Sequence, residues 1–140
     1  MNRKPVTPLL TVDCVAIDAK GRTLLIKRGH PPFQGHYALP GGFVEDGETV
    51  EDACRRELLE ETGVVAKKLT LIGVYSDPAR DPRGHTASAA FLARVRSAGA
   101  KAGDDAAAVE WVDNWRRLDL AFDHKQILKD AAKLLARPRD

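Results

Sequence analysis

Glu57, Glu60 and Glu61 place three carboxylates within five positions of a segment, residues 41–64, that holds eight acidic residues. Residues 48–62 include neither Gly nor Pro and are rich in helix formers, which predicts a helix closed by a glycine C-cap. Because positions i, i+3 and i+4 of a helix share a face, the three carboxylates would project from one side. Clustered oxygen ligands of this kind suit a hard divalent cation.

A solvated charged face is the alternative interpretation of this cluster. Repulsion between like charges at i and i+4 costs roughly 0.2–0.5 kcal/mol per pair. The helix dipole disfavours acids in the last turns by about 0.3–1 kcal/mol each. The acidic side also carries Val50, Ala53 and Cys54, apolar residues that would face inward. A neutralising divalent ion explains the arrangement better than solvation does.

The available ligands favour Mg²⁺ or Mn²⁺ over zinc. The four histidines and two cysteines show no zinc-ligand spacing. Mg²⁺ keeps several waters and usually shares its coordination shell with substrate phosphates, so the cluster indicates phosphate or diphosphate chemistry. The Gly-rich motif of a P-loop is missing. We expect structural hydrogen bonds or helix capping from three histidines and burial as small hydrophobes for both cysteines: His30, His36, His124, Cys14 and Cys54.

Strands have to position this helix, and the rest of the chain supplies them. β-rich segments at 9–18 and 23–28, joined by a glycine turn, predict a hairpin. Further strands are expected at 69–77, 86–96 and 109–113, loops at 29–42, 76–85 and 97–107, and an amphipathic helix at 123–137 capped by Asp123. Each helix must bury a face against the sheet. We therefore predict one domain, residues 1–140, of the α/β class, an α/β/α sandwich around a mixed β-sheet.

Composition and charge exclude several other classes of protein. The 140 residues are 44% apolar and 30% charged, which is typical of a globular domain with a hydrophobic core. The formal net charge of +2 is too small to indicate a nucleic-acid partner. No apolar run approaches the roughly 20 residues of a membrane span, and the start of the chain lacks the apolar region of a signal peptide. We expect a cytoplasmic location, without nucleic-acid or membrane partners.

The acidic segment resembles the signature of the Nudix hydrolase family. That signature specifies nine positions in a 23-residue frame, and the chain supplies all of them: Gly42, Glu48, Arg56, Glu57, Leu58, Glu60, Glu61, Gly63 and Val64. The resemblance implies a Nudix-type sandwich with a loop–helix–loop metal site for a diphosphate linked to another moiety. It implies Glu57, Glu60, Glu61 and the Gly42 carbonyl as ligands of Mg²⁺ or Mn²⁺. It also implies Arg56 as the residue that orients the glutamates and Glu48 as the one that holds the loop to the helix, with a metal-activated water as nucleophile.

Three other segments resemble the ADP-ribose pyrophosphatase subgroup of that family: "RGHPPFQGHYALPGGFVEDGE", "VYSDPARDPRGHTASAAFLA" and "LAFDHKQILKDA". They imply hydrolysis of ADP-ribose to AMP and ribose 5-phosphate. Arg80 and Arg83 could each bind phosphate oxygens with two donors. Asp81 could accept from ribose hydroxyls, and His85 could donate. The alternative is an exposed turn, since Asp-Pro occurs twice in this stretch.

Other candidate residues flank the glycine loop and the last strand. Arg28 ends a predicted strand and could face phosphate, while Phe33 and Tyr37 could stack on adenine or pack within the loop. Clustered carboxylates can act as the base, and three acids near the last strand are further candidates for a general base or form a solvated loop: Asp104, Asp105 and Glu110. Trp111 and Trp115 pack in the core or lie at a homodimer interface.

Two rival functions stay open. A nucleoside triphosphate or dinucleotide hydrolase could use the same metal helix. A regulator that senses ADP-ribose without hydrolysing it is the rival from another class. The intact signature, and the lack of a DNA-binding segment after "LLARPRD", favour an enzyme.

Overall fold

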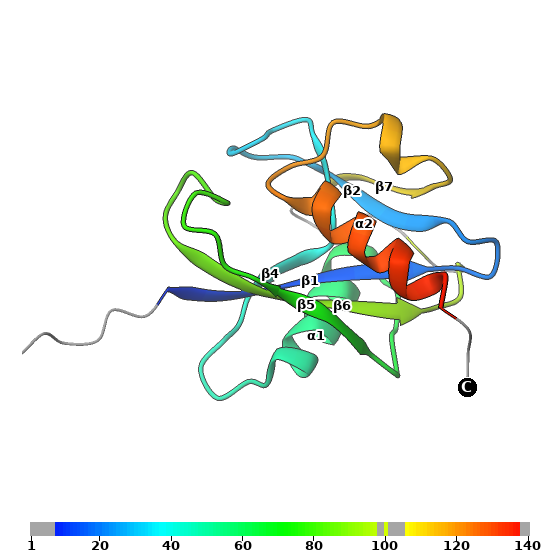
Figure 1. Cartoon of the computed structure of the whole chain (residues 1–140), viewed down its shortest axis with the longest axis horizontal. Helices are drawn as coiled ribbons and strands as arrows, with labels where there is room; N and C mark the ends of the chain where they lie inside the picture. Colours follow the sequence, from blue (N-terminus) through cyan, green and yellow to red (C-terminus); the bar gives the residue numbers. More distant parts are fainter. Residues whose placement is uncertain (1–7, 98–99, 101–105, 138–140) are drawn as a thin grey trace, which may run out of the picture.

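The computed structural model describes residues 8–97, residue 100 and residues 106–137, and Figure 1 shows them as a sheet with helices. The strands are β1 (Leu9–Ile17), β2 (Thr23–Arg28), β3 (Tyr37–Ala38), β4 (Gly41–Phe43), β5 (Thr70–Tyr75), β6 (Thr86–Arg94) and β7 (Ala106–Val112). The helices are α1 (Val50–Thr62) and α2 (His124–Leu135), with a short 3₁₀ turn, η1, at Trp115–Arg117.

The sheet is mixed, as predicted, and β1 is its centre. β1 runs parallel to β6 from Leu9↔Thr86 to Ile17↔Arg94 and antiparallel to β4. It meets β2 only at Ile17↔Thr23, where the hairpin turns. β2 in turn pairs antiparallel with β3 and β7, and β5 forms the far edge beside β6. A parallel pair needs a long crossover, and here that crossover between β1 and β6 contains the acidic helix.

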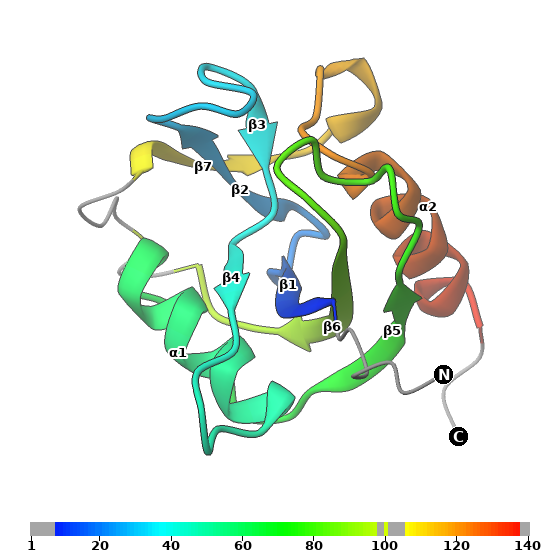
Figure 2. The same ribbon diagram turned by 90° about the vertical axis from the view of Figure 1, so that its left-hand side faces the viewer.

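The two long helices lie on opposite sides of the strands, as Figure 2 shows. Alternating residues of β1 explain this arrangement, because successive side chains of a strand point to opposite faces. Val12 and Cys14 pack in the cluster that contains Leu58 of α1, whereas Val15 packs in the cluster that contains Ile127 of α2. The structure is therefore the predicted sandwich, with one apolar core on each face of the sheet.

The ends of α1 follow the local sequence signals. The Thr49 hydroxyl accepts a hydrogen bond from the backbone N–H of Asp52 at 3.1 Å and caps the first turn. Gly63 adopts a left-handed conformation with φ 73°, and its N–H donates to the Leu59 carbonyl at 2.9 Å. The predicted helix at 48–62 is thus confirmed, with a start two residues later.

Three local predictions were wrong in detail. The predicted loop at 29–42 contains the short strands β3 and β4. β4 pairs with β1 because Gly41 has no Cβ, which would collide with the Val12 carbonyl oxygen. Asp123 occupies the N-cap position of α2, but its side chain makes no capping hydrogen bond and binds Arg80 instead. η1 and the start of β7 at Ala106 were not anticipated.

The remaining expectations concern burial of the cysteines and tryptophans and the lack of a membrane-spanning segment. Cys14 and Cys54 are buried free thiols, as expected. Trp115 is buried among the residues that pack against α2, and Trp111 packs against the cluster on the α1 side. No helix in the described part of the chain has the length and apolar character needed to cross a membrane.

Candidate active site

Arg56 is the hub of the acidic helix. Its Nε and Nη2 donate to the two carboxylate oxygens of Glu48 at 2.7 and 3.0 Å, and Nη2 also donates to the Phe43 carbonyl at 3.1 Å. Its Nη1 donates to Glu57 Oε1 at 3.0 Å and to Glu60 Oε2 at 3.3 Å. The guanidinium therefore joins the strand before the helix, the loop and two of the three clustered glutamates. This arrangement agrees with the orienting role expected for Arg56 and the loop-holding role expected for Glu48.

The glycine bend, Gly41–Gly42, lies against the side chains of Glu57 and Glu61. The Gly41 N–H donates to Glu61 Oε2 at 2.8 Å. The Glu57 carboxylate sits so close to Gly42 that a Cβ there would lie 2.5 Å from Glu57 Oε1. A side chain at position 42 would therefore displace the Glu57 carboxylate from its present place. Glu57 and Glu61 are thus both in contact with the Gly41–Gly42 bend.

Glu57 and Glu61 are poorly neutralised by the protein. Burial raises the pKa of Glu57 above its ordinary value even though Arg56 opposes the shift. Burial, together with the nearby negative charge of Glu57, raises the pKa of Glu61 to about 8, against the hydrogen bond from Gly41. Two adjacent, partly buried carboxylates with this electrostatics are stabilised by a cation between them.

These residues fit a divalent metal ion that completes its shell with water and substrate. Glu57, Glu61 and the adjacent Gly42 carbonyl offer hard oxygen ligands. Glu60 is more remote, since its side chain is 58% exposed and its carboxylate faces Arg56. Within the described ranges, no three His, Cys, Asp or Glu side chains converge into a ready-made metal cage. An ion such as Mg²⁺, which retains waters and binds substrate phosphates, does not need such a cage.

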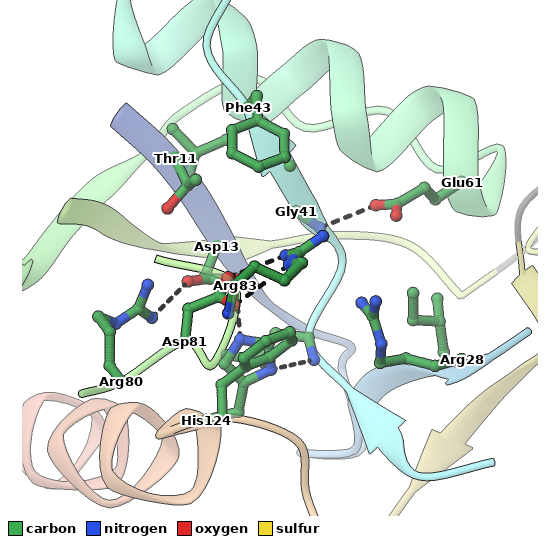
Figure 3. Close-up of a pocket in the computed structure, with 15 residues that line it drawn as sticks. Thr11, Asp13, Arg28, Gly41, Phe43, Glu61, Arg80, Asp81, Arg83 and His124 are labelled. Carbon is green, nitrogen blue, oxygen red and sulfur yellow. Dashed lines mark hydrogen bonds and ion pairs between the residues drawn. The ribbon is translucent and has the colours of Figure 1, made fainter. Parts of the chain in front are cut away.

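A cleft opens to solvent beside the glycine bend. Figure 3 shows Glu61 reaching Gly41 from the helix, with Asp13, Arg80 and His124 across the strand. Six of the predicted site residues line this cleft: Arg28, Gly42, Glu61, Arg80, Asp81 and Arg83. Residues more than 50 positions apart in the sequence thus meet around one opening.

Arg80 is held inside the protein and does not point freely into the cleft. Its Nε and Nη2 donate to the two carboxylate oxygens of Asp123 at 2.9 and 2.7 Å, and its Nη1 donates to Thr86 Oγ1 at 2.9 Å. Its side chain is 5% exposed, and Asp13 Oδ2 lies 3.5 Å from Nη2. The sequence predicts that Arg80 binds phosphate with two donors. Its guanidinium donors already bind protein oxygens. This geometry favours a role in positioning the wall of the cleft.

Asp81 holds Arg83. The buried Asp81 carboxylate accepts from the Nε and Nη2 of Arg83 at 3.1 and 2.9 Å, and from its backbone N–H at 2.9 Å. Burial would raise the pKa of Asp81, but these contacts outweigh it and lower the pKa below its ordinary value. The Asp81 oxygens expected to meet ribose hydroxyls face Arg83 instead. The Arg83 side chain remains 49% exposed at the cleft.

The remaining predicted residues lie at different distances from the cleft. His85 is exposed and its Nε2 lies 2.9 Å from the Ser76 carbonyl, outside the lining. Phe33 is also outside the lining and packs edge-on against Phe122, with ring centroids 4.9 Å apart. Tyr37, the other stacking candidate, donates from its hydroxyl to Glu110 at 3.0 Å.

Of the three acids near the last strand, only Glu110 can be placed. It pairs with Leu25 of β2, whose side chain packs on the α2 face, so Glu110 points away from α1. This position separates it from the glutamate cluster and speaks against a role as general base. Asp104 and Asp105 lie outside the described residues.

The sequence reasoning missed a buried polar network behind the cleft. Asp13 of β1 accepts from Ser88 Oγ at 2.6 Å and from His124 Nε2 at 3.1 Å. His124 Nδ1 accepts from the Leu39 N–H at 3.0 Å, so the proton of the neutral ring is on Nε2. Burial alone would raise the pKa of Asp13, but the contacts with His124, Ser88 and Arg80 lower it. A lone acid inside the apolar run "TVDCVAI" was the signal, because a buried charge needs partners.

Comparisons with known proteins agree with this fold. The family model described as NUDIX domain matches residues 7–137. The chain is 52% identical over 123 residues to the ADP-ribose pyrophosphatase of Methanocaldococcus jannaschii, across 88% of this chain and 72% of that protein. It is 33% identical to the ADPR responsive transcriptional repressor NtrR of Acinetobacter baylyi, across 89% of this chain and 53% of that protein.

A solved structure shows the same fold. The NUDIX domain of Shewanella oneidensis NrtR complexed with ADP ribose superposes with a TM-score of 0.87 at 29% identity. The match covers 96% of this chain and 95% of the other. The chain therefore spans nearly all of that domain but only about half of the repressor from A. baylyi.

Proposed function

Because this chain belongs to the NUDIX domain family, we propose that it is a divalent-metal-dependent hydrolase that cleaves ADP-ribose into AMP and ribose 5-phosphate. One observation carries the proposal. Glu57 and Glu61 converge on the Gly41–Gly42 bend at a cleft that Arg28 and Arg83 also line or border. Such a cleft has a place for a cation and a place for phosphate oxygens within one opening.

The metal ligands in this proposal are Glu57, Glu60, Glu61 and the Gly42 carbonyl, and the oxygen donors favour Mg²⁺ or Mn²⁺. When bound, such an ion polarises phosphoryl oxygens and lowers the pKa of a coordinated water. Glu60 joins the set by turning its exposed carboxylate away from Arg56, a contact of 3.3 Å that costs little to break.

The other side chains orient and bind. Arg56 fixes Glu57 and, through Glu48, the loop before the helix. Arg28 and Arg83 bind the diphosphate, since planar guanidinium groups match phosphate oxygens. Asp81 keeps Arg83 in place, and Arg80 fixes the loop at 76–85 against α2 through Asp123.

Phe33 and His85 support the same surface from outside the lining. Phe33 braces the aromatic ring of Phe122, which does line the cleft. His85 holds the loop before β6 through the Ser76 carbonyl.

ADP-ribose is the substrate that the comparisons favour. The M. jannaschii relative is named an ADP-ribose pyrophosphatase, and the S. oneidensis domain was solved with ADP ribose. The rival within the family, cleavage of nucleoside triphosphates or dinucleotides, uses the same metal helix. The A. baylyi repressor supports the other rival, a sensor that binds ADP-ribose without turnover. The intact arrangement around Arg56 favours turnover, because a pure sensor has no need of the clustered glutamates.

We further propose that the chain is one cytoplasmic domain, acts without nucleic acid or membrane, and forms a homodimer. The strand β5 at the edge of the sheet supports the homodimer. It exposes Leu71 and Val74 to 53% and 64%, and a second copy could cover these apolar side chains.

The decisive experiment is a substrate panel. Purified protein is incubated with Mg²⁺ or Mn²⁺ and, in separate reactions, ADP-ribose, dinucleotides and nucleoside triphosphates, and the products are identified by mass. We expect AMP and ribose 5-phosphate from ADP-ribose at a higher kcat/KM than for any other compound, and no product when a chelator removes the metal. Preference for a triphosphate would support the first rival. Tight binding of ADP-ribose without product would support the sensor.

A further inference from the structure

Phe122 has a backbone conformation that few side chains tolerate. It precedes α2 with φ 54°, in the left-handed region, where a bulky aromatic residue is an outlier. Its neighbours hold it there. The Ala121 N–H donates to the Tyr37 carbonyl at 2.8 Å, Asp123 binds Arg80, and His124 binds Leu39. Strain that persists in this way often serves a functional site.

The ring of Phe122 lies beside two positive charges. The Cζ atom of Arg28 lies 5.0 Å from the ring centroid, and that of Arg83 lies 5.8 Å from it. Both distances are within the range in which a guanidinium is attracted to an aromatic ring. Burial, followed by the positive charge of Arg83, lowers the pKa of Arg28, against the negative charges of Asp81 and Glu61. The ring of Phe122 is thus in contact range of both cations, and the ring of Phe43 lies 5.7 Å from the Cζ of Arg83 alone.

Both arginines keep donors free for a ligand. Arg28 donates through Nε to the Pro32 carbonyl at 2.7 Å, and Arg83 donates through Nε and Nη2 to Asp81. Neither the two η nitrogens of Arg28 nor Nη1 of Arg83 has a hydrogen-bond partner in the part of the chain that the structure describes. Two anchored cations with free ends at one cleft are suited to an anion with two charged groups.

We propose that Phe122 is a positioning residue whose ring holds Arg28 and Arg83 as a two-point clamp for the diphosphate of the substrate. The inference rests on the proposed function only in naming a diphosphate as the anion. Arg28, Arg83 and Phe122 line the same cleft as Gly42 and Glu61. The clamp and the proposed metal site therefore share one opening.

Phe122→Leu tests the proposal, because leucine keeps an apolar side chain but has no aromatic face. Two quantities are measured: the affinity for inorganic pyrophosphate without metal, by calorimetry, and KM and kcat for ADP-ribose with Mg²⁺. We expect affinity roughly tenfold weaker and KM roughly tenfold higher, as the loss of two cation–π contacts implies, with kcat within about twofold of wild type. Phe122→Tyr, which restores the ring, should recover both values. A purely structural role would not produce this division between KM and kcat.

Arg116 offers a matched control. Its Cζ lies 4.3 Å from the ring of Trp115, away from the cleft. Arg116→Gln therefore removes the same charge and the same kind of contact as Arg83→Gln. We expect only Arg83→Gln to weaken pyrophosphate binding. Equal losses in both variants would mean a general charge effect and would overturn the clamp.

The remaining outcomes are also decisive. A folded Phe122→Leu protein with wild-type pyrophosphate affinity, or a Phe122→Tyr protein that fails to recover it, overturns the proposal. If Phe122→Leu does not fold, Phe122→Asn replaces it, because asparagine adopts positive φ more readily and also lacks the ring. Suppose that wild type binds pyrophosphate with an affinity that depends on the ring of Phe122 and yet fails to hydrolyse ADP-ribose. In that case the clamp stands and the proposed function fails.

Discussion

The carboxylates on the two walls of the cleft have pKa values shifted in opposite directions. On the helix wall, burial raises the pKa values of Glu57 and Glu61, although Arg56 opposes the shift at Glu57 and Arg28 opposes it at Glu61. On the opposite wall, contacts with arginines and a histidine lower the pKa values of Asp13 and Asp81 despite burial. The comparison is between acids whose pKa values are raised by burial and acids whose pKa values are lowered by their partners.

This difference separates two functions of buried charge. Asp81 fixes Arg83, and Asp123, with Asp13 nearby, fixes Arg80, so these acids contribute to the shape of the cleft and to the stability of the fold. Glu57 and Glu61, by contrast, have raised pKa values despite their contacts with Arg56 and Gly41, so their charged forms cost stability in the isolated chain and are favoured when a cation binds. Replacing an acid should therefore reduce activity on the helix wall and reduce stability on the opposite wall.

The largest expected effect is on catalysis. Glu57→Gln or Glu61→Gln removes a charged metal ligand, and we expect kcat/KM for ADP-ribose to fall by at least about 100-fold, or about 2.7 kcal/mol of transition-state stabilisation. For Glu61→Gln, the free energy of unfolding without metal should stay the same or increase, because repulsion between the two carboxylates is removed. Glu57→Gln also loses its ion pair with Arg56, so its stability does not test the comparison. Steady-state kinetics and urea unfolding measure the two quantities.

Glu51→Gln is the matched control for that prediction. Glu51 is an exposed acid in the first turn of the same helix, outside the cluster, so both quantities should stay near wild type. Near-normal turnover in both the Glu57 and Glu61 variants would exclude the metal site.

The second prediction concerns the opposite wall. Asp123→Ala leaves the guanidinium of Arg80, whose side chain is 5% exposed, without its main partner. Loss of one partner from a buried ion pair typically costs about 3–5 kcal/mol of stability. We expect a decrease toward the lower end of that range, because Thr86 and Asp13 remain near Arg80. Urea unfolding measures it.

Asp119→Ala serves as the control for this variant, since Asp119 is an exposed acid in the segment just before α2. Its replacement should change the free energy of unfolding by less than about 0.5 kcal/mol. If Asp123→Ala were equally mild, the opposite wall would not depend on paired charge and the contrast between the walls would be lost.

The sequence revealed the helix wall because its contacts are local. Arg56 and Glu60 are four residues apart, Arg56 and Glu48 are eight apart, and the caps of α1 lie next to the helix itself. Helix periodicity and a known spacing of residue types were enough to predict which side chains share a face. Five strands of the sheet also followed from their own patterns of β-forming residues, whereas the short strands β3 and β4 did not.

The opposite wall could not be derived in this way, because its contacts join distant parts of the chain. Arg80 and Asp123 are 43 residues apart, and Asp13 and Ser88 are 75 apart. The sequence therefore suggested the nearest local use for each residue, a helix cap for Asp123 and a free phosphate ligand for Arg80. The left-handed backbone of Phe122 was equally hidden, because tertiary contacts impose it against the preference of the residue.

The smallest expected effect sharpens the comparison through pH. Asp18, at the turn between β1 and β2, is another buried acid whose charge is satisfied. Burial would raise its pKa, but the backbone and side chain of Arg22 and the N–H of Lys20 lower it below the ordinary value of 3.8. An acid with a lowered pKa in the folded state stabilises the protein above the pKa of the unfolded chain. That stability is lost as the pH falls through the folded pKa.

Asp18→Asn should therefore destabilise the protein by about 0.5–1.5 kcal/mol at pH 6, the range of a typical hydrogen bond, and by less at pH 3. Urea unfolding at the two pH values measures the difference, and Asp46→Asn, at an exposed acid, should show a small effect at both. A loss at pH 3 as large as the loss at pH 6 would mean that shape rather than charge matters at this turn. Asp81 binds Arg83 through the same combination of backbone and guanidinium contacts. Charge would then not explain the stability of that pair on the cleft wall either.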